Sequence, residues 1–193
     1  MSVAALVLAA GSSSRLGQPK QLLRLAGESL VHRAARLALA AGCDPVLVVI
    51  GARGAAVAQA LAGLGVACVP NPEWREGMAA SIRSGVARLR HCDPPPSGLL
   101  ILLSDQPAVD ADCLRSLLDA HHEHPERRVA CSYAETPGVP ALFPPADWDA
   151  LLALRGDRGA QALLSADPAS LLQVPLPGGE RDVDRPEDAR ALD

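Results

Sequence analysis

The chain has 193 residues, of which 49% are apolar, and it carries a net charge of −4 with an isoelectric point near 5.7. This length predicts a single domain, residues 1–193, with enough apolar surface for a buried core. The acidic balance and the small number of aromatic residues argue against surfaces that bind nucleic acid or an anionic membrane.

The first eight residues lack a basic leader, and no apolar stretch is long enough to span a bilayer. The five cysteines form an odd set without a C-x-x-C pair, which is typical of reduced residues in a core. We therefore expect a cytoplasmic protein.

Short apolar runs alternate along the chain with segments of helical periodicity. The predicted strands are Ala4–Ala9, Pro45–Ile50, Val66–Val69, Gly98–Leu103, Val129–Tyr133, Val139–Phe143 and, more weakly, Leu171–Val174. Several are apolar throughout, as strands covered on both faces are. This alternation predicts an α/β fold, a Rossmann-like, doubly wound three-layer αβα sandwich with a mostly parallel central sheet.

The first predicted strand leads into a loop that ends at Lys20, the only lysine among seventeen arginines. Gly11 and Gly17 permit tight turns, and backbone amides in such loops bind phosphate oxygens. The spacing matches neither the G-x-x-x-x-G-K-[ST] loop nor the G-x-G-x-x-G fingerprint. A slim ammonium group suits a crowded phosphate site, so we predict phosphate binding by Lys20; an ordinary strand-to-helix turn is the alternative.

The segment Asn71–Val86 combines a turn with the start of a helix rich in small residues. Small side chains leave room for a planar ring, Gly77 permits close backbone approach, and Ser81 offers a hydroxyl to a base edge. A helix packed tightly on a sheet would have the same composition.

The predicted strand Gly98–Leu103 delivers Asp105 at its carboxyl end. Pro107 prevents further strand pairing, so we expect this carboxylate to be presented rather than buried. Mg²⁺ prefers one or two carboxylates together with substrate phosphates, which makes Asp105 a candidate metal ligand. The alternative is a helix cap, but Asp110 is better spaced for that role.

Two further groups of polar residues follow. His121, His122 and His124 cluster at a predicted helix end, where we expect them to be solvated. Asp182 and Asp184 fall on one side of an extended segment before Pro186, and either is a candidate second metal ligand.

These motifs together resemble the nucleotidyltransferases of the molybdenum cofactor branch. The resemblance spans almost the whole chain and is carried by Ala9-Ala10-Gly11, Arg15, Lys20, Gly77–Gly85, Asp105-Gln106-Pro107 and Asp182-x-Asp184-Arg-Pro-Glu-Asp. The segment Gly156-Asp157-Arg158-Gly159-Ala160 also resembles that branch. The loop with a late lysine is shared more widely, including by enzymes that act on sugar phosphates.

The resemblance implies transfer of a nucleoside monophosphate from CTP or GTP to the terminal phosphate of molybdopterin, with release of pyrophosphate. It implies catalytic roles for Arg15, Lys20 and Asp105, and Mg²⁺ held by Asp105 with Asp182 or Asp184. The implied nucleotide-binding residues are Leu8, Ala9, Ala10, Gly11, Ser12, Arg15, Lys20, Gly77 and Ser81.

Ala10 stands where GTP-using members commonly have glycine, and its methyl group narrows the pocket, which favours CTP. The alternatives are a GTP-using guanylyltransferase, a nucleotidyltransferase for sugar or polyol phosphates, and a non-catalytic carrier that delivers the cofactor to a recipient molybdoenzyme.

Overall fold

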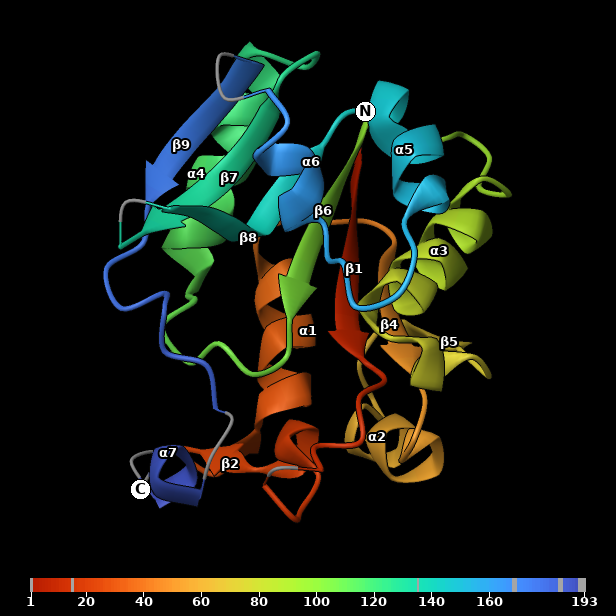
Figure 1. Cartoon of the computed structure of the whole chain (residues 1–193), viewed down its shortest axis with the longest axis vertical. Coiled ribbons are helices and arrows are strands. Elements are labelled where there is room, and N and C mark those ends of the chain that lie inside the picture. The colour runs from red at the N-terminus through yellow and green to blue at the C-terminus, as the bar shows by residue number, and fades with distance from the viewer. Residues whose placement is uncertain (1, 15, 135, 168–169, 184–185, 191–193) are drawn as a thin grey trace.

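The computed structural model describes residues 2–14, 16–134, 136–167, 170–183 and 186–190. Within these ranges, a seven-stranded sheet has the order β5-β4-β1-β6-β8-β7-β9 (Figure 1). Its strands are β1 (Val3–Ala9), β4 (Val46–Ile50), β5 (Ala67–Pro70), β6 (Gly98–Leu103), β7 (Arg128–Tyr133), β8 (Thr136–Phe143) and β9 (Leu171–Pro175). All seven were predicted, and only β8 runs antiparallel to its neighbours.

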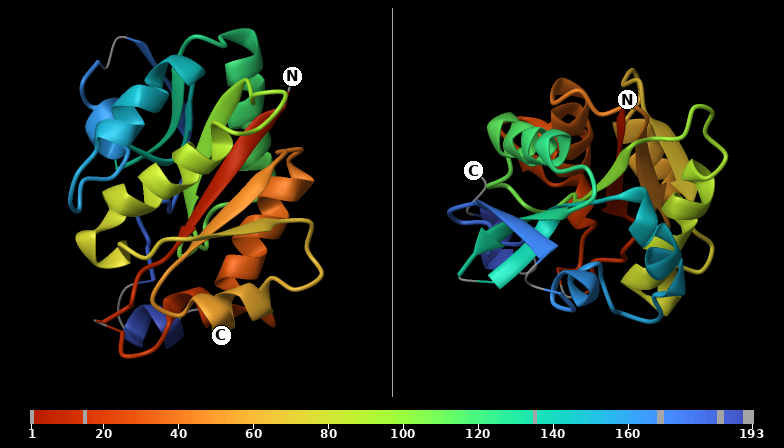
Figure 2. Two further views of the ribbon diagram at one scale, coloured as in Figure 1. Left: turned by 90° about the vertical axis from the view of Figure 1, so that its right-hand side faces the viewer. Right: turned by 90° about the horizontal axis from the view of Figure 1, so that it is seen from above.

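Helices cover both faces of this sheet, which makes it the middle layer of three (Figure 2). They are α1 (Leu30–Ala40), α2 (Gly54–Ala60), α3 (Met78–Leu89), α4 (Ala111–Glu123), α5 (Trp148–Ala153), α6 (Gln161–Leu164) and α7 (Pro186–Arg190), with 3₁₀ turns η1 (Lys20–Leu22), η2 (Trp74–Glu76) and η3 (Pro145–Asp147). The first core cluster joins α1, α2 and α4 to one face, and the second joins α3, α5 and α6 to the other. The predicted three-layer α/β sandwich is confirmed. The hairpin of β2 (Arg24–Leu25) and β3 (Glu28–Ser29) was not predicted.

The apolar run of β1 is explained by its position between the two cores. Ala5 and Val7 belong to the cluster with α1, whereas Leu6 and Leu8 belong to the cluster with α3. Removing apolar surface from water contributes roughly 25 cal/mol per Å², so burial on both faces holds β1 firmly at the centre of the sheet.

Residues at the helix ends explain two boundaries. Gly42 follows α1 with φ +93°, a left-handed conformation that glycine adopts without steric cost. Asp110 caps α4, since its carboxylate accepts a hydrogen bond from the amide of Cys113 at 2.8 Å, as the sequence predicted.

Two expectations about side-chain burial were partly wrong. All five cysteines are free, but Cys68 is exposed on the edge strand β5 and Cys92 is only half-buried. His121 is buried, not solvated, because it packs against Gly98 at the start of β6; His122 and His124 are exposed as expected. In the part of the chain that the structure describes, no helix is long and apolar enough to cross a membrane.

The centre of the sheet brings the carboxyl ends of β1 and β6 together. β1 pairs in parallel with β4 on one side and with β6 on the other, with Leu8 opposite Leu103. The chain leaves β1 toward β4 and reaches β6 from α3, so the connections diverge at this point, where ligands bind in open α/β sheets. After β9 the chain passes this end, and the amide of Val183 donates to the carbonyl of Asp105 at 3.1 Å (Figure 1).

Candidate active site

The loop after β1 is held in shape by two polar side chains. Ser13 has φ +54°, and its hydroxyl oxygen accepts a hydrogen bond from the amide of Lys20 at 3.0 Å. Gln21 is buried, and its amide nitrogen donates to the carbonyls of Ala9 and Gly11 at 3.2 and 2.7 Å. The loop is therefore preorganised: η1 folds back onto the strand and carries Lys20 with it.

Lys20 and Asp105 meet at the junction of β1 and β6. The ammonium nitrogen of Lys20 contacts a carboxylate oxygen of Asp105, although the two residues lie far apart in the sequence. Asp105 is only 5% exposed, so the expectation of a presented carboxylate was wrong. The amide of Val183 donates to its backbone carbonyl, and the amide of the neighbouring Gln106 donates to the carbonyls of Val139 and Gly179 at 3.1 and 3.4 Å.

A cavity of about 860 Å³ opens at this junction. Its lining includes the predicted residues Leu8, Ala10, Gly11, Ser12, Lys20, Gly77, Ser81, Asp105 and Asp182. Ala9 is absent from the lining because its side chain packs in the core on the α1 side. A second cavity, of about 680 Å³, lies between the β2–β3 hairpin and α2 and contains none of the predicted residues.

Two of the predicted residues, Arg15 and Asp184, lie outside the described residues. Asp182 is described and lines the same cavity as Asp105. Their convergence joins the carboxyl end of β6 to the segment after β9, which is the arrangement expected for the two acids.

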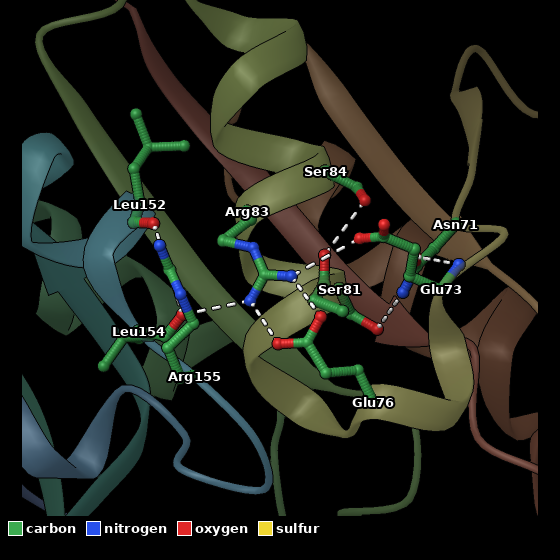
Figure 3. A network of polar contacts seen from close by, with 10 residues as sticks. Asn71, Glu73, Glu76, Ser81, Arg83, Ser84, Leu152, Leu154 and Arg155 are labelled. Atoms are coloured by element: carbon green, nitrogen blue, oxygen red, sulfur yellow. Dashed lines mark hydrogen bonds and ion pairs between the residues drawn. The ribbon is translucent and has the colours of Figure 1, made fainter.

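The start of α3 forms a wall of this cavity through Gly77, Met78 and Ser81. Gly77 has φ +116°, and a Cβ there would lie 2.3 Å from an oxygen of Asp157 and 2.7 Å from the backbone of Gly156. This glycine therefore permits close approach of the Gly156 backbone and the Asp157 side chain to the start of α3. Ser81 is buried, and its hydroxyl accepts a hydrogen bond from the Asn71 amide at 3.1 Å, which holds it against the turn after β5 (Figure 3).

The donor set at the junction fits a divalent cation bound together with a triphosphate. Asp105 and Asp182 supply carboxylate oxygens, which Mg²⁺ and Mn²⁺ prefer, and substrate phosphates and water can complete the coordination. Among the described residues, no group of three or more acidic, histidine or cysteine side chains could hold a metal by itself. The Lys20 contact shows that Asp105 already has a cationic neighbour.

Comparison with known proteins identifies the family. Residues 5–171 match the family described as MobA-like NTP transferase domain. The chain belongs to the MobA-like NTP transferase family. The chain is a nucleotidyltransferase of this family, and the matched region includes the loop after β1, Lys20 and Asp105.

Relatives of this MobA-like nucleotidyltransferase carry diverse names. Nicotine blue oxidoreductase from Paenarthrobacter nicotinovorans is 32% identical over 86% of this chain and 83% of its own length. The purine catabolism protein PucB from Bacillus subtilis is 30% identical over 94% of this chain and 91% of its own. A stretch of 48 residues, 25% of this chain and 24% of the relative, is 58% identical to a probable molybdenum cofactor guanylyltransferase from Synechococcus elongatus.

A solved structure extends the likeness over the entire fold. Rv0371c from Mycobacterium tuberculosis H37Rv has a TM-score of 0.85 and 31% identity, covering 100% of this chain and 97% of its own. The structure of its complex with manganese matches with a TM-score of 0.79 and 30% identity, over 100% and 97% of the two chains.

Sequence reasoning missed the residues that brace the site of this MobA-like protein. Gln21 and Ser13 hold the loop, and Asn71 holds Ser81. The signal for Gln21 was its amide directly after the single lysine and before the apolar pair Leu22-Leu23. For Asn71, the sequence offered only a turn residue before proline.

Proposed function

We propose that this chain is a magnesium-dependent nucleotidyltransferase that transfers CMP from CTP to the phosphate of molybdopterin and releases pyrophosphate. The observation that carries the proposal is the meeting of Lys20 and Asp105 beside the β1 loop, in one cavity with Asp182. A cation, acidic metal ligands and a loop of backbone amides are the groups that a triphosphate requires. The short match to a molybdenum cofactor guanylyltransferase and the family membership support the acceptor class.

In the proposed reaction, an oxygen of the acceptor phosphate attacks the α-phosphorus of CTP. The bond between that phosphorus and the oxygen bridging to the β-phosphate breaks, and its electron pair leaves with pyrophosphate. The attacking oxygen is already anionic, so orientation and charge neutralisation suffice without a general base. Lys20, with Arg15, would neutralise the charge that develops on the departing group.

The proposed metal ligands are Asp105 with Asp182 or Asp184. A divalent cation bound there would neutralise the phosphate oxygens. The manganese complex of Rv0371c, a structure 30% identical to this chain, supports a divalent metal at this fold. The amides of Gly11 and Ser12 would bind the phosphates, while Leu8, Ala9, Ala10, Gly77 and Ser81 would surround the nucleoside.

We also propose that residues 1–193 act as one nucleotidyltransferase domain and work in the cytoplasm, with a recipient molybdoenzyme as a candidate partner. The continuous sheet from β1 to β9 supports the single domain. The Ala10 methyl group in the cavity lining supports CTP over GTP.

Pyrophosphate release tests the proposal. Purified protein with Mg²⁺ is given CTP or GTP together with molybdopterin, a sugar phosphate or a polyol phosphate, and we expect release with CTP and molybdopterin. Release only with GTP would instead indicate a guanylyltransferase, and release only with another acceptor would indicate a nucleotidyltransferase for sugar or polyol phosphates. Because one relative is named an oxidoreductase, oxidation of NADH and NADPH is followed in parallel and is expected to be absent.

The carrier alternative is tested by activation of an apo-molybdoenzyme. We expect Lys20→Ala and Asp105→Ala variants to fail in this assay as they fail in pyrophosphate release. Full activation by both variants would instead favour a carrier.

A further inference from the structure

The segment Leu154–Asp157 lies directly on the first turn of α3. The amide of Ala79 donates to the carbonyl of Gly156 at 3.1 Å. The missing side chain of Gly77 is what permits this approach, since a Cβ there would collide with Gly156 and Asp157. Both Gly77 and Asp157 line the cavity that holds Lys20. The contact between α3 and this segment therefore shapes one wall of the candidate active site.

An ion pair between Glu76 of η2 and Arg83 of α3 contacts the same segment. Arg83 donates to both carboxylate oxygens of Glu76 at 2.8 and 2.5 Å, and it also donates to the carbonyl of Leu154 at 3.0 Å (Figure 3). The Arg83 guanidinium, together with the backbone amide of Gly156, holds the pKa of Glu76 below its usual value. Arg83 thus bonds to the backbone of Leu154, and Glu76 bonds to the backbone of Gly156.

Neither Glu76 nor Arg83 is among the residues that line the cavity. Surface ion pairs in general contribute little to global stability, whereas the planar geometry of a bidentate Arg–carboxylate pair fixes the relative positions of the groups that it joins. Arg83, Glu76 and the Ala79 amide each form a hydrogen bond with the segment Leu154–Asp157. Bonds directed at one short segment suit the positioning of that segment better than the stabilisation of the whole fold.

We propose that the Glu76–Arg83 pair is a positioning device, which holds Leu154–Asp157 against α3 and so sets the cavity wall formed by Gly77, Met78 and Asp157. The proposal rests on the proposed function, because it assigns this wall to the nucleoside of the bound triphosphate. Arg83 then acts on nucleotide binding through Asp157 and Gly77, without touching the nucleotide itself.

The test compares Arg83→Ala with Arg90→Ala. Arg90 is a matched control because it directly follows α3 and pairs with Asp149 of α5, but it does not line the cavity. Hydrogen exchange of the peptide containing residues 154–157 should accelerate in Arg83→Ala and remain unchanged in Arg90→Ala. CTP and GTP are both titrated by calorimetry. For the nucleotide that binds wild-type protein, the dissociation constant should rise roughly tenfold or more in Arg83→Ala, because small misplacements of a binding group cost this much affinity.

A double-mutant cycle with Asp157→Ala tests the route of the effect. If Arg83 acts through the segment, Arg83→Ala should add little to the loss of affinity already caused by Asp157→Ala. In steady-state kinetics, KM for the nucleotide should rise more than kcat falls. Unchanged exchange in Arg83→Ala, or affinity equal to that of Arg90→Ala, would overturn the proposal.

Two milder variants keep the test decisive if Arg83→Ala does not fold. Arg83→Lys retains the charge but loses the fork that binds two oxygens and a carbonyl, and Glu76→Gln retains the shape but loses the charge. Both should give intermediate exchange and affinity, and wild-type values for both would overturn the proposal. Absence of pyrophosphate release in wild-type protein would count against the proposed function alone, because exchange and nucleotide affinity need no acceptor.

Discussion

Lys20 contacts Asp105 inside the cavity, and it is the only lysine of the chain. Arginines occupy every other basic position. The geometry explains why the two are not interchangeable here. The partner carboxylate is buried and the η1 turn is short, so a slim stem fits where a broad guanidinium would displace its neighbours.

At this scale we predict that Lys20→Ala lowers kcat by about 10²–10³-fold, because a single preorganised donor to developing charge contributes that much. Lys20→Arg should not restore the rate. Pyrophosphate release measures kcat, and circular dichroism verifies that each variant is folded. Arg24→Ala is the control, since Arg24 is exposed and donates to the Gly27 carbonyl away from this cavity. Full activity of Lys20→Ala would contradict the proposed role.

Gln21 provides a second prediction, because its buried amide joins the end of the loop after β1 to the start of that loop. Gln21→Leu removes the donor for the carbonyls of Ala9 and Gly11, and a lost buried partner costs about 1–3 kcal/mol. We expect kcat/KM to fall roughly tenfold or more as the loop loses its shape. Gln59→Leu on the exposed side of α2 should leave the kinetics unchanged. Equal kinetics for the two variants would show that the brace has no role.

Among the elements, the distance of α3 from β1 depends on the contact between Gly85 and Leu6. Gly85 faces Leu6, and a Cβ at that position would lie 2.2 Å from a methyl carbon of the leucine. Leu6 is fully buried, so its side chain has little space into which it could move. The glycine thus permits the helix to come this near to the sheet.

We therefore predict that Gly85→Ala lowers the free energy of unfolding by about 1–2 kcal/mol, despite the better helix propensity of alanine, because overpacking costs more than the propensity adds. Urea denaturation gives the value. Gly54→Ala in α2 is the matched control: its Cβ would lie 3.4 Å from Ile50, an ordinary contact, and alanine should be neutral or stabilising there. Equal effects at both positions would contradict the packing explanation.

At the scale of the whole molecule, His121 and Glu28 are among the ionisable groups that make the free energy of unfolding depend on pH. Burial lowers the pKa of His121, whose imidazole lies beside the carbonyl of Ser97 with a nitrogen–oxygen distance of 3.2 Å. Hydrogen bonds from Arg36, and less strongly from His32, lower the pKa of Glu28 to about 2. In both cases the unfolded chain binds the proton more tightly than the folded protein does.

Stability should therefore fall in two steps as the pH is lowered. The first begins below the unfolded histidine pKa of about 6.5, and the second begins below the unfolded glutamate value of 4.5 and continues to about 2. Urea denaturation across pH 7 to 2 measures both. His121→Gln should remove the first step, whereas His122→Gln at an exposed position should not; Glu28→Gln should weaken the second. Retention of the upper step in His121→Gln would refute its assignment.

Much of the architecture follows from local sequence. The strands were predicted because apolar runs such as Gly98–Leu103 are short and bounded by proline and glycine, and the cap at Asp110 was predicted from its spacing to the helix. The convergence of the β1 loop with Asp105 also followed, since parallel strands end at the same edge of a sheet.

Tertiary structure alone decided which residues are covered and how closely segments approach. The antiparallel direction of β8, the hydrogen bond of the Val183 amide to the Asp105 carbonyl and the close contact of Gly77 with Gly156 join residues distant in the chain. Periodicity and spacing report only on neighbours within one element, whereas these contacts depend on how whole layers pack. The sequence by itself therefore determined the layers and the edge that holds the site, and only packing determined the shape of the cavity.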